Sequence, residues 1–393
     1  MMGECTMFSP DRYEFFCPVK TNSGSRALEH LPFELDTMNA TKPFVITSQK
    51  DARRGLVDVI IDAFKDSGVT IGIFDGAPAA PGMKLIKELF TMYRDGGYDS
   101  LIAVGGGAVV DTAKILNIAV SGAPEDIERY AGSDLITKPL KPLVLVPTLS
   151  GTGYESSRYA CIDTLSFSSC FLMPHLVVID PRMIVFEDVE TTAAASLVTL
   201  THAVEVYTGP EKNPLSDSYA YAAIRFVMEN LVSVIRDPRD GKGRLALVNA
   251  HNAAGCAFSN STPGMAHRLG KAVGDACQLS WGLCMGILLP HILERQTSED
   301  GYHIPGLLLP LAGFDVYAET PEHMKVQKAI GILYDFQRDL FEASRGAIVR
   351  SLKDAEVPEE MLRDIARKAA GRSSTGFDAD VSLMVLEQAW KGK

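Results

Sequence analysis

The stretch "LIAVGGGAVVDTAKIL", residues 101–116, decides the fold class of this chain. An apolar run of strand length leads into three glycines, and a helix-forming segment follows them. Glycine permits a tight turn and a close approach of a ligand to the backbone, and the N–H groups at the start of a helix attract an anion. This order predicts a loop that binds the pyrophosphate of a dinucleotide. The alternative is a glycine turn that only reverses the chain.

Strand-length apolar runs alternate with helical patterns up to about residue 185. Each run is nearly continuous, which is typical of parallel strands that are buried on both faces of a sheet. The runs lie at residues 42–48, 69–76, 98–107, 142–148 and 175–181. We therefore predict an α/β dinucleotide-binding domain with a parallel sheet over residues 1–185.

Beyond residue 185 the strand pattern ends and long helical patterns follow. Pro181 closes the last predicted strand, and an acidic stretch leads into the next helix. We predict that residues 186–393 form an all-helical domain that completes the active-site cleft.

A second loop of small residues, "PTLSGTGYESS" at 147–157, follows another predicted strand. Open α/β sheets bind their ligands at the carboxyl ends of the strands, so two such loops predict a nucleotide crevice. The alternative is a helix start capped by serine or threonine, with no ligand.

Composition excludes several classes of partner. The formal net charge of -11 argues against nucleic acid, because phosphate backbones are bound through clustered lysine and arginine. The chain has no apolar run as long as a membrane span and no secretory pattern at its start, and its seven cysteines form no C-x-x-C pair. We predict a cytoplasmic protein without a membrane or nucleic-acid partner.

Six motifs in order carry a resemblance to a known family. They are "GGGAVVDTAK", "PTLSGTGYE", "VVIDP", "LTHAVEVY", "NPLSDSYAYAAI" and "AAGCAFSNSTPGMAH". Over roughly residues 40–295 the chain resembles the iron-containing (group III) alcohol dehydrogenases. The resemblance implies a nucleotide-binding α/β domain, a helical domain with a metal site, and hydride transfer between a nicotinamide and a small alcohol or aldehyde. It also implies a homo-oligomer, as a dimer.

The same resemblance implies which residues bind the cofactor. They lie in the two loops and at the end of the first predicted strand. The predicted set is Ser48, Gly105, Gly106, Gly107, Ala108, Asp111, Thr148, Leu149 and Thr152.

The family's metal is held by one aspartate and three histidines, and only two of these are present. The four positions carry Val198, His202, His267 and Trp281. Metal sites usually need at least three protein ligands, so we predict that the metal is absent. The alternative is a metal held by an unfamiliar set that recruits Asp275, Cys277 or Glu205, although their spacing selects none of them.

Catalysis without a metal needs another group near the developing alkoxide. Four residues after His267, where the family commonly carries a histidine, this chain has Lys271. Burial in an apolar cleft would lower the pKa of that lysine towards working pH and make it a proton donor. We predict Lys271, His267 and His202 as the catalytic set. The alternatives are a solvated surface lysine and, for His202, a core histidine with a satisfied hydrogen bond.

The end of the first predicted strand bears on the choice of cofactor. Family members often carry there an aspartate that would repel a 2′-phosphate, whereas this chain has Ser48, followed by Lys50, Arg53 and Arg54. Loss of the carboxylate beside several cations favours NADP(H) over NAD(H).

Together these observations predict an NAD(P)-dependent oxidoreductase of the alcohol dehydrogenase type that works without a metal. The rival hypothesis is a nucleotide-binding homologue that has lost catalysis and has a regulatory or assembly role. Composition and motif spacing do not separate the two.

Overall fold

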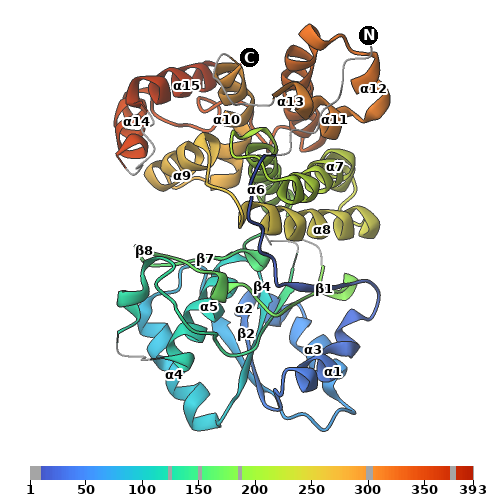
Figure 1. Ribbon diagram of the computed structural model, residues 1–393, viewed down its shortest axis with the longest axis vertical. Coiled ribbons are helices and arrows are strands. Elements are labelled where there is room, and N and C mark those ends of the chain that lie inside the picture. Colours follow the sequence, from blue (N-terminus) through green and yellow to red (C-terminus); the bar gives the residue numbers. More distant parts are fainter. Residues whose placement is uncertain are drawn as a thin grey trace. The chain divides into compact units, whose positions relative to one another are not determined.

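The computed structural model describes residues 10–122, 126–148, 153–184, 188–297, 304–371 and 378–392. The chain divides into two compact units (Figure 1). One unit is Phe16–Glu187, and the other is Asp188–Lys393 together with Met1–Phe15.

A six-stranded parallel sheet forms the centre of Phe16–Glu187, with the order β1-β9-β6-β4-β2-β3. The strands are β1 (Lys20–Ser23), β2 (Pro43–Ser48), β3 (Gly72–Ala77), β4 (Ser100–Gly105), β6 (Leu143–Pro147) and β9 (Leu176–Ile179). The last five coincide with the predicted strands. The sequence pattern missed β1, because this edge strand is polar and largely exposed and carries no apolar run.

Helices cover both faces of this sheet (Figure 1). On one face, α1 and α3 pack against alternate residues of the strands through Leu31, Leu35, Leu56, Ile60 and Phe64. On the other side lie α4 and α5, and α5 starts directly after β4. The helices are α1 (Leu31–Thr37), α2 (Gln49–Arg53), α3 (Leu56–Phe64), α4 (Met83–Gly96) and α5 (Gly107–Ser121).

A small second sheet adjoins α5. Strands β7 (Tyr159–Ile162) and β8 (Leu165–Ser168) form an antiparallel hairpin, and β5 (Gly132–Ser133) pairs with β8. This hairpin follows the predicted second loop in the sequence.

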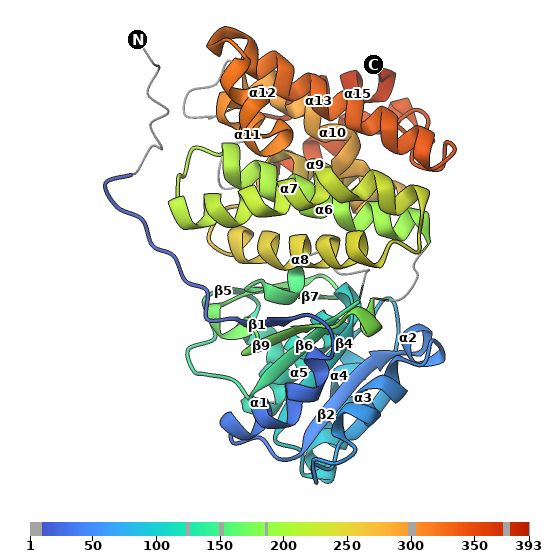
Figure 2. The same ribbon diagram turned by 90° about the vertical axis from the view of Figure 1, so that its right-hand side faces the viewer.

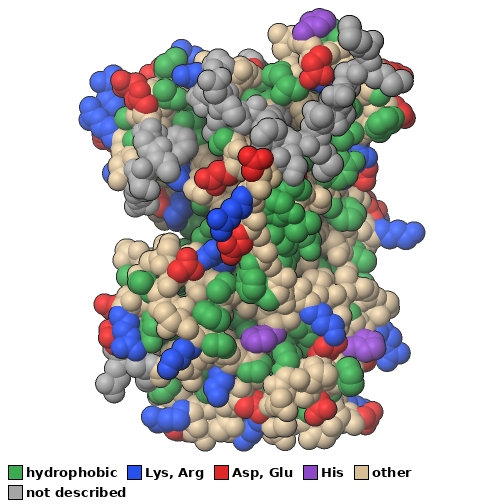
Figure 3. Space-filling view, viewed as in Figure 1, with side chains coloured by type: hydrophobic (Ala, Val, Ile, Leu, Met, Phe, Trp, Pro, Cys, Tyr) green, Lys and Arg blue, Asp and Glu red, His purple; other side chains and the backbone are tan. Residues whose placement is uncertain are grey.

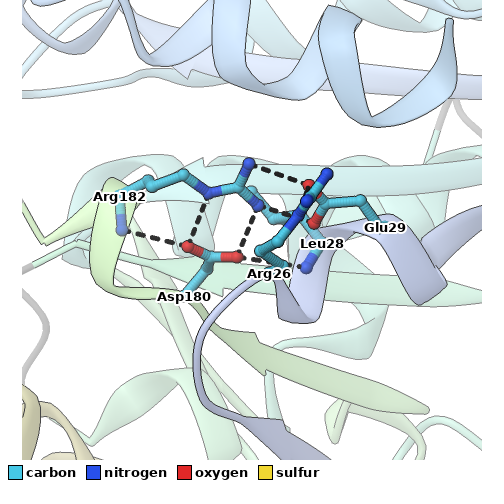
Figure 4. Close-up of polar contacts among 5 residues, drawn as sticks. All are labelled: Arg26, Leu28, Glu29, Asp180 and Arg182. Carbon is cyan, nitrogen blue, oxygen red and sulfur yellow. Dashed lines mark hydrogen bonds and ion pairs between the residues drawn. The ribbon is translucent and has the colours of Figure 1, made fainter.

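A buried carboxylate, that of Asp180, lies directly after β9. Asp180 accepts hydrogen bonds from the backbone N–H of Leu28 (3.3 Å) and from Arg182, whose Nη2 lies 2.7 Å away (Figure 4). Arg182 also donates two hydrogen bonds to Glu29. Burial alone would raise the pKa of Asp180, but these hydrogen bonds hold it below its usual range. The network ties the segment after β1 to the last strand of the sheet.

The other unit is helical, and its central helix is α6 (Val189–Thr208). Apolar and small residues occur on every side of α6, and such a helix is stable only when neighbours surround it. Helices α7, α8, α9 and α10 pack around it (Figures 1 and 2). Their bounds are α7 (Pro214–Arg236), α8 (Gly241–Phe258), α9 (Met265–Cys277) and α10 (Trp281–Gln296).

Among the described residues of this unit, five further α-helices follow α10. They are α11 (Ile304–Ala312), α12 (Phe314–Glu319), α13 (Glu322–Ala343), α14 (Leu362–Ala370) and α15 (Ala379–Lys391). The predicted fold class, a parallel α/β domain followed by an all-helical domain, is confirmed.

Acidic and basic side chains are interspersed on the face in Figure 3. The net negative charge is therefore not gathered into one patch on that face. Over the described ranges, no helix is both long enough and apolar enough to cross a bilayer.

One buried histidine predicts a measurable pH dependence of stability. His251 on α8 is 1% exposed, and neither ring nitrogen has a hydrogen-bond partner among the described residues. Burial lowers the pKa of His251 from 6.5 to about 3, so the unfolded chain binds more protons between these values. The free energy of unfolding must then fall as pH falls, by about 2 kcal/mol at pH 5 from this group.

We expect His251→Leu to remove the part of the decrease in the free energy of unfolding at low pH that comes from this histidine. Urea unfolding at pH 7 and pH 5 should show a smaller decrease for the variant than for the wild type, whereas the exposed control His323→Gln should follow the wild type. Equal decreases for all three proteins would contradict the assignment.

Candidate active site

Two histidines from different helices meet in the helical unit. His202 lies in the middle of α6, and His267 lies in the first turn of α9. Nε2 of His202 is 2.8 Å from Nδ1 of His267, so one ring donates a hydrogen bond to the other. Burial lowers the pKa of His202 well below its usual value and that of His267 to about 4. Both imidazoles are therefore neutral near pH 7.

An aromatic side chain holds this pair from one side. The Phe258 ring, at the end of α8, stacks on His202 with a centroid distance of 4.1 Å and an interplanar angle of 12°. It also contacts His267 at 5.6 Å. This packing fixes the His202 ring in a position where its Nε2 faces His267.

Glu205, on the same helix as His202, caps the helix that carries His267. Its Oε1 accepts hydrogen bonds from the backbone N–H groups of Ala266 (2.6 Å) and His267 (3.3 Å), and its Oε2 accepts one from Gly264 (3.2 Å). Burial raises the pKa of this carboxyl to about 7. The sequence analysis considered Glu205 only as a substitute metal ligand, and the structure gives its carboxylate a different task.

Two of the positions that the family resemblance assigns to metal ligands carry no carboxylate or imidazole side chain. Val198 lies one turn before His202 on α6 and is buried, and Trp281 begins α10 with 38% of its surface exposed. In the part of the chain that the structure describes, no three histidine, cysteine, aspartate or glutamate side chains are grouped so that they could hold a metal ion.

Lys271 lies one turn beyond His267 on α9, and its environment differs from the expected one. Its Nζ lies 3.3 Å from the centroid of the Trp281 ring and 3.5 Å from Oδ2 of Asp275. About a third of the side chain (32%) is exposed. The expected burial of Lys271 in an apolar cleft is therefore wrong. Its ammonium group instead contacts the face of the Trp281 ring and the Asp275 carboxylate.

In the unit Phe16–Glu187, the three glycines at 105–107 form the turn between β4 and α5. Gly105 ends β4 with φ +150°, where a Cβ would lie 3.0 Å from Val109 Cγ2. Gly106 is the N-cap residue and offers no side chain to the first N–H groups of α5, which begins with Gly107 and Ala108. This helix start can receive an anionic group.

Behind the glycine turn, α5 is hydrogen-bonded to the end of the second loop and to β7, which follows it. Asp111 Oδ1 accepts a hydrogen bond from the Cys161 N–H (3.2 Å). Lys114 is completely buried and donates hydrogen bonds to the carbonyl oxygens of Tyr154 and Ser157, both at 2.6 Å, and Tyr159 at 3.0 Å. The sequence analysis gave Lys114 no role, although it lies within the quoted "GGGAVVDTAK" motif.

Ser48 caps α2 and holds a carboxylate close to the glycine turn. Its Oγ accepts a hydrogen bond from the Asp51 N–H (3.1 Å) and donates one to Asp51 Oδ2 (2.8 Å). Oδ2 lies 3.3 Å from where a Cβ on Gly105 would be. The sequence analysis missed Asp51, which the S-x-x-D capping spacing could have indicated.

Of the three predicted cofactor-binding residues in the second loop, the structure describes Thr148, which is buried directly after β6. Leu149 and Thr152 lie outside the described residues.

Comparison with protein-family models covers both units. Residues 18–181 match the model described as "Iron-containing alcohol dehydrogenase", and residues 192–379 match "Fe-containing alcohol dehydrogenase family, C-terminal". The chain belongs to the iron-containing alcohol dehydrogenase family. The resemblance drawn from the sequence motifs is confirmed.

Relatives of this family align along most of the chain. Long-chain-alcohol dehydrogenase 1 of Geobacillus thermodenitrificans is 28% identical over 90% of this chain and 89% of its own length. The NAD-dependent methanol dehydrogenase of Bacillus methanolicus is 26% identical over 71% of this chain and 74% of its own length. The structure of an alcohol dehydrogenase from Oenococcus oeni superimposes with a TM-score of 0.87 at 24% identity, over 96% of this chain and all of that one.

Membership of the iron-containing alcohol dehydrogenase family confirms the prediction of an NAD(P)-dependent oxidoreductase of the alcohol dehydrogenase type.

Proposed function

We propose that this chain interconverts a small alcohol and its aldehyde or ketone by hydride transfer with a nicotinamide dinucleotide, without a metal ion at the family's metal position. The observation that carries the metal-free part is the direct hydrogen bond between His202 and His267.

The donor set does not fit a metal ion. Two ligand positions are hydrocarbon or indole, Val198 and Trp281, and neither supplies a carboxylate or imidazole. The facing nitrogens of His202 and His267 are 2.8 Å apart, so one ring donates a hydrogen bond to the other. Two nitrogens on one tetrahedral zinc ion lie about 3.3 Å apart, because each bond is about 2.0–2.1 Å long and both lone pairs point at the metal.

Lys271 is the proton donor in this proposal. When bound, the nicotinamide cofactor supplies or accepts the hydride at the substrate carbon. The carbonyl oxygen then becomes an alkoxide, which the Lys271 ammonium can hydrogen-bond and protonate. The neighbouring His267, bonded to His202, can orient the same oxygen as a neutral hydrogen-bonding group.

The test is oxidation of NADH and NADPH by chelator-treated protein with short, aromatic and acidic aldehydes, repeated after addition of ferrous iron or zinc. We expect turnover in chelator. Turnover that needs added metal would overturn the metal-free assignment. Cofactor binding without any turnover would overturn the proposed activity and favour the non-catalytic homologue.

The charged residues around Ser48 have opposing effects on the predicted preference for NADP(H). The exposed Lys50 and Arg53 beside Ser48 favour a 2′-phosphate, but Asp51 brings a carboxylate to the same strand end, and Arg54 lies 3.9 Å from it. A carboxylate at this position disfavours a 2′-phosphate. We expect Asp51 to limit the preference for NADP(H).

We therefore expect Asp51→Asn to raise the ratio of kcat/KM for NADPH to that for NADH by roughly tenfold, which corresponds to about 1.4 kcal/mol. Asp58→Asn, in the first turn of α3, is the matched control and should leave the ratio unchanged. A ratio that moves equally in both variants would remove Asp51 from cofactor selection.

The cytoplasmic location, the homo-oligomeric assembly and the assignment of residues 1–185 and 186–393 as functional domains belong to the same proposal. Family membership and the sequence patterns support them.

A further inference from the structure

We propose that Glu205 is a positioning residue that holds His267 against His202 by capping helix α9 from helix α6. This inference rests on the proposed function, because it assigns to Glu205 the task of fixing the catalytic set.

Helix α9 depends on another helix for its N-terminal cap. Its own N-cap residue is Gly264, which has no side chain, whereas α6, α8 and α15 are capped by Asp188, Asp240 and Asp378. Glu205, 59 or more residues away in the sequence, supplies the missing carboxylate. It accepts hydrogen bonds from three backbone N–H groups at the N-terminus of α9. The positive end of the helix also favours the ionised form of this carboxyl.

The local sequence is shaped to admit this carboxylate. A Cβ on Gly264 would lie 2.4 Å from Oε1 of Glu205, which is too close for any other residue type. A buried carboxylate is costly unless hydrogen bonds satisfy it, and here backbone N–H groups do so on both oxygens. Glycine at this position is therefore part of the cap.

The cap acts on the site because α6 contacts His267 twice. His202 meets the ring of His267 at 2.8 Å, and Glu205, three residues later, accepts the backbone N–H of His267 at 3.3 Å. One contact fixes the ring and the other fixes the backbone that carries it. Lys271, one turn along the same helix, is positioned by the same attachment.

Four variants separate positioning from simple stabilisation. Glu205→Ala removes all three hydrogen bonds, and Gly264→Ala displaces the carboxylate while keeping it. Glu205→Gln can keep the two bonds to Oε1, from Ala266 and His267. Asp378→Ala removes the cap of α15, a helix without predicted site residues, and is the matched control for lost stability.

We expect Glu205→Ala and Gly264→Ala to lower kcat at least tenfold, with KM for the cofactor within twofold of wild type, because small misplacements of reacting groups are costly. Glu205→Gln should stay within about threefold of wild type, as a conservative rescue. The inference is overturned if Glu205→Ala lowers kcat no more than Asp378→Ala does, or if Glu205→Gln is as impaired as Glu205→Ala.

A second measurement does not depend on turnover. Spectra of protein with ¹⁵N-labelled histidine report the hydrogen-bonded pair, and His202→Asn and His267→Asn assign the signals. We expect the pair's signals to persist in Glu205→Gln and Asp378→Ala and to shift or disappear in Glu205→Ala and Gly264→Ala. Persistence in Glu205→Ala would overturn the inference, whereas an inactive wild type with these spectral changes would overturn only the proposed function.

Discussion

Replacing Lys114 with methionine is expected to lower the free energy of unfolding by about 3–5 kcal/mol. The ammonium group is completely buried and donates to the carbonyl oxygens of Tyr154, Ser157 and Tyr159. Burial lowers the pKa of Lys114 to about 8, and the nearby Asp111 and Glu155 oppose this shift. Methionine fills a similar volume but removes the ammonium donor from three carbonyls and a nearby positive charge from the two carboxylates.

Chemical denaturation measures this loss, and binding of NADH or NADPH measured by fluorescence should weaken with it. The loss of binding is expected because Lys114 holds the end of the second loop and the start of β7 against α5. Lys84→Met is the control, since its side chain is 93% exposed and lies 4.0 Å from Glu88. It should change the free energy of unfolding by less than about 0.5 kcal/mol. Equal effects of the two substitutions would show that the buried hydrogen bonds do not stabilise the fold.

Replacing Lys271 with alanine is expected to lower kcat for carbonyl reduction by about 10² to 10⁴ while the Kd of the cofactor changes little. The loss follows from removal of the proposed proton donor one turn beyond His267 on α9. Steady-state kinetics with the aldehyde that gives turnover, together with a cofactor titration, measure the two quantities. Unchanged turnover would end the proton-donor assignment.

Asp275→Asn is the informative companion to Lys271→Ala. The carboxylate lies 3.5 Å from the ammonium group, so its neutralisation removes the ion pair but keeps the donor. We expect kcat of this variant to remain within a fewfold of wild type. If Asp275→Asn matched Lys271→Ala, the pair would be required as a unit and Lys271 alone could not be the donor.

Local sequence determined the strands and the glycine turn, and the resemblance to the family indicated the expected metal-ligand positions. Apolar runs and glycines report backbone conformation directly, so β2, β3, β4, β6, β9 and the start of α5 were predictable. That resemblance places Val198 and Trp281 at two of those positions, and neither side chain is a usual metal ligand. No contact between distant segments is needed for either conclusion.

Only the tertiary structure decided what the charged residues do. Glu205 caps a helix that begins 60 residues later. Lys114 donates hydrogen bonds to backbone carbonyls that begin at residue 154. Lys271 contacts Trp281 and Asp275 instead of being buried. These outcomes depend on which helix ends and side chains packing brings together, and no local pattern records that. Hydrophobic periodicity specifies an element and its buried face, whereas hydrogen bonds between elements arise only after the elements are packed.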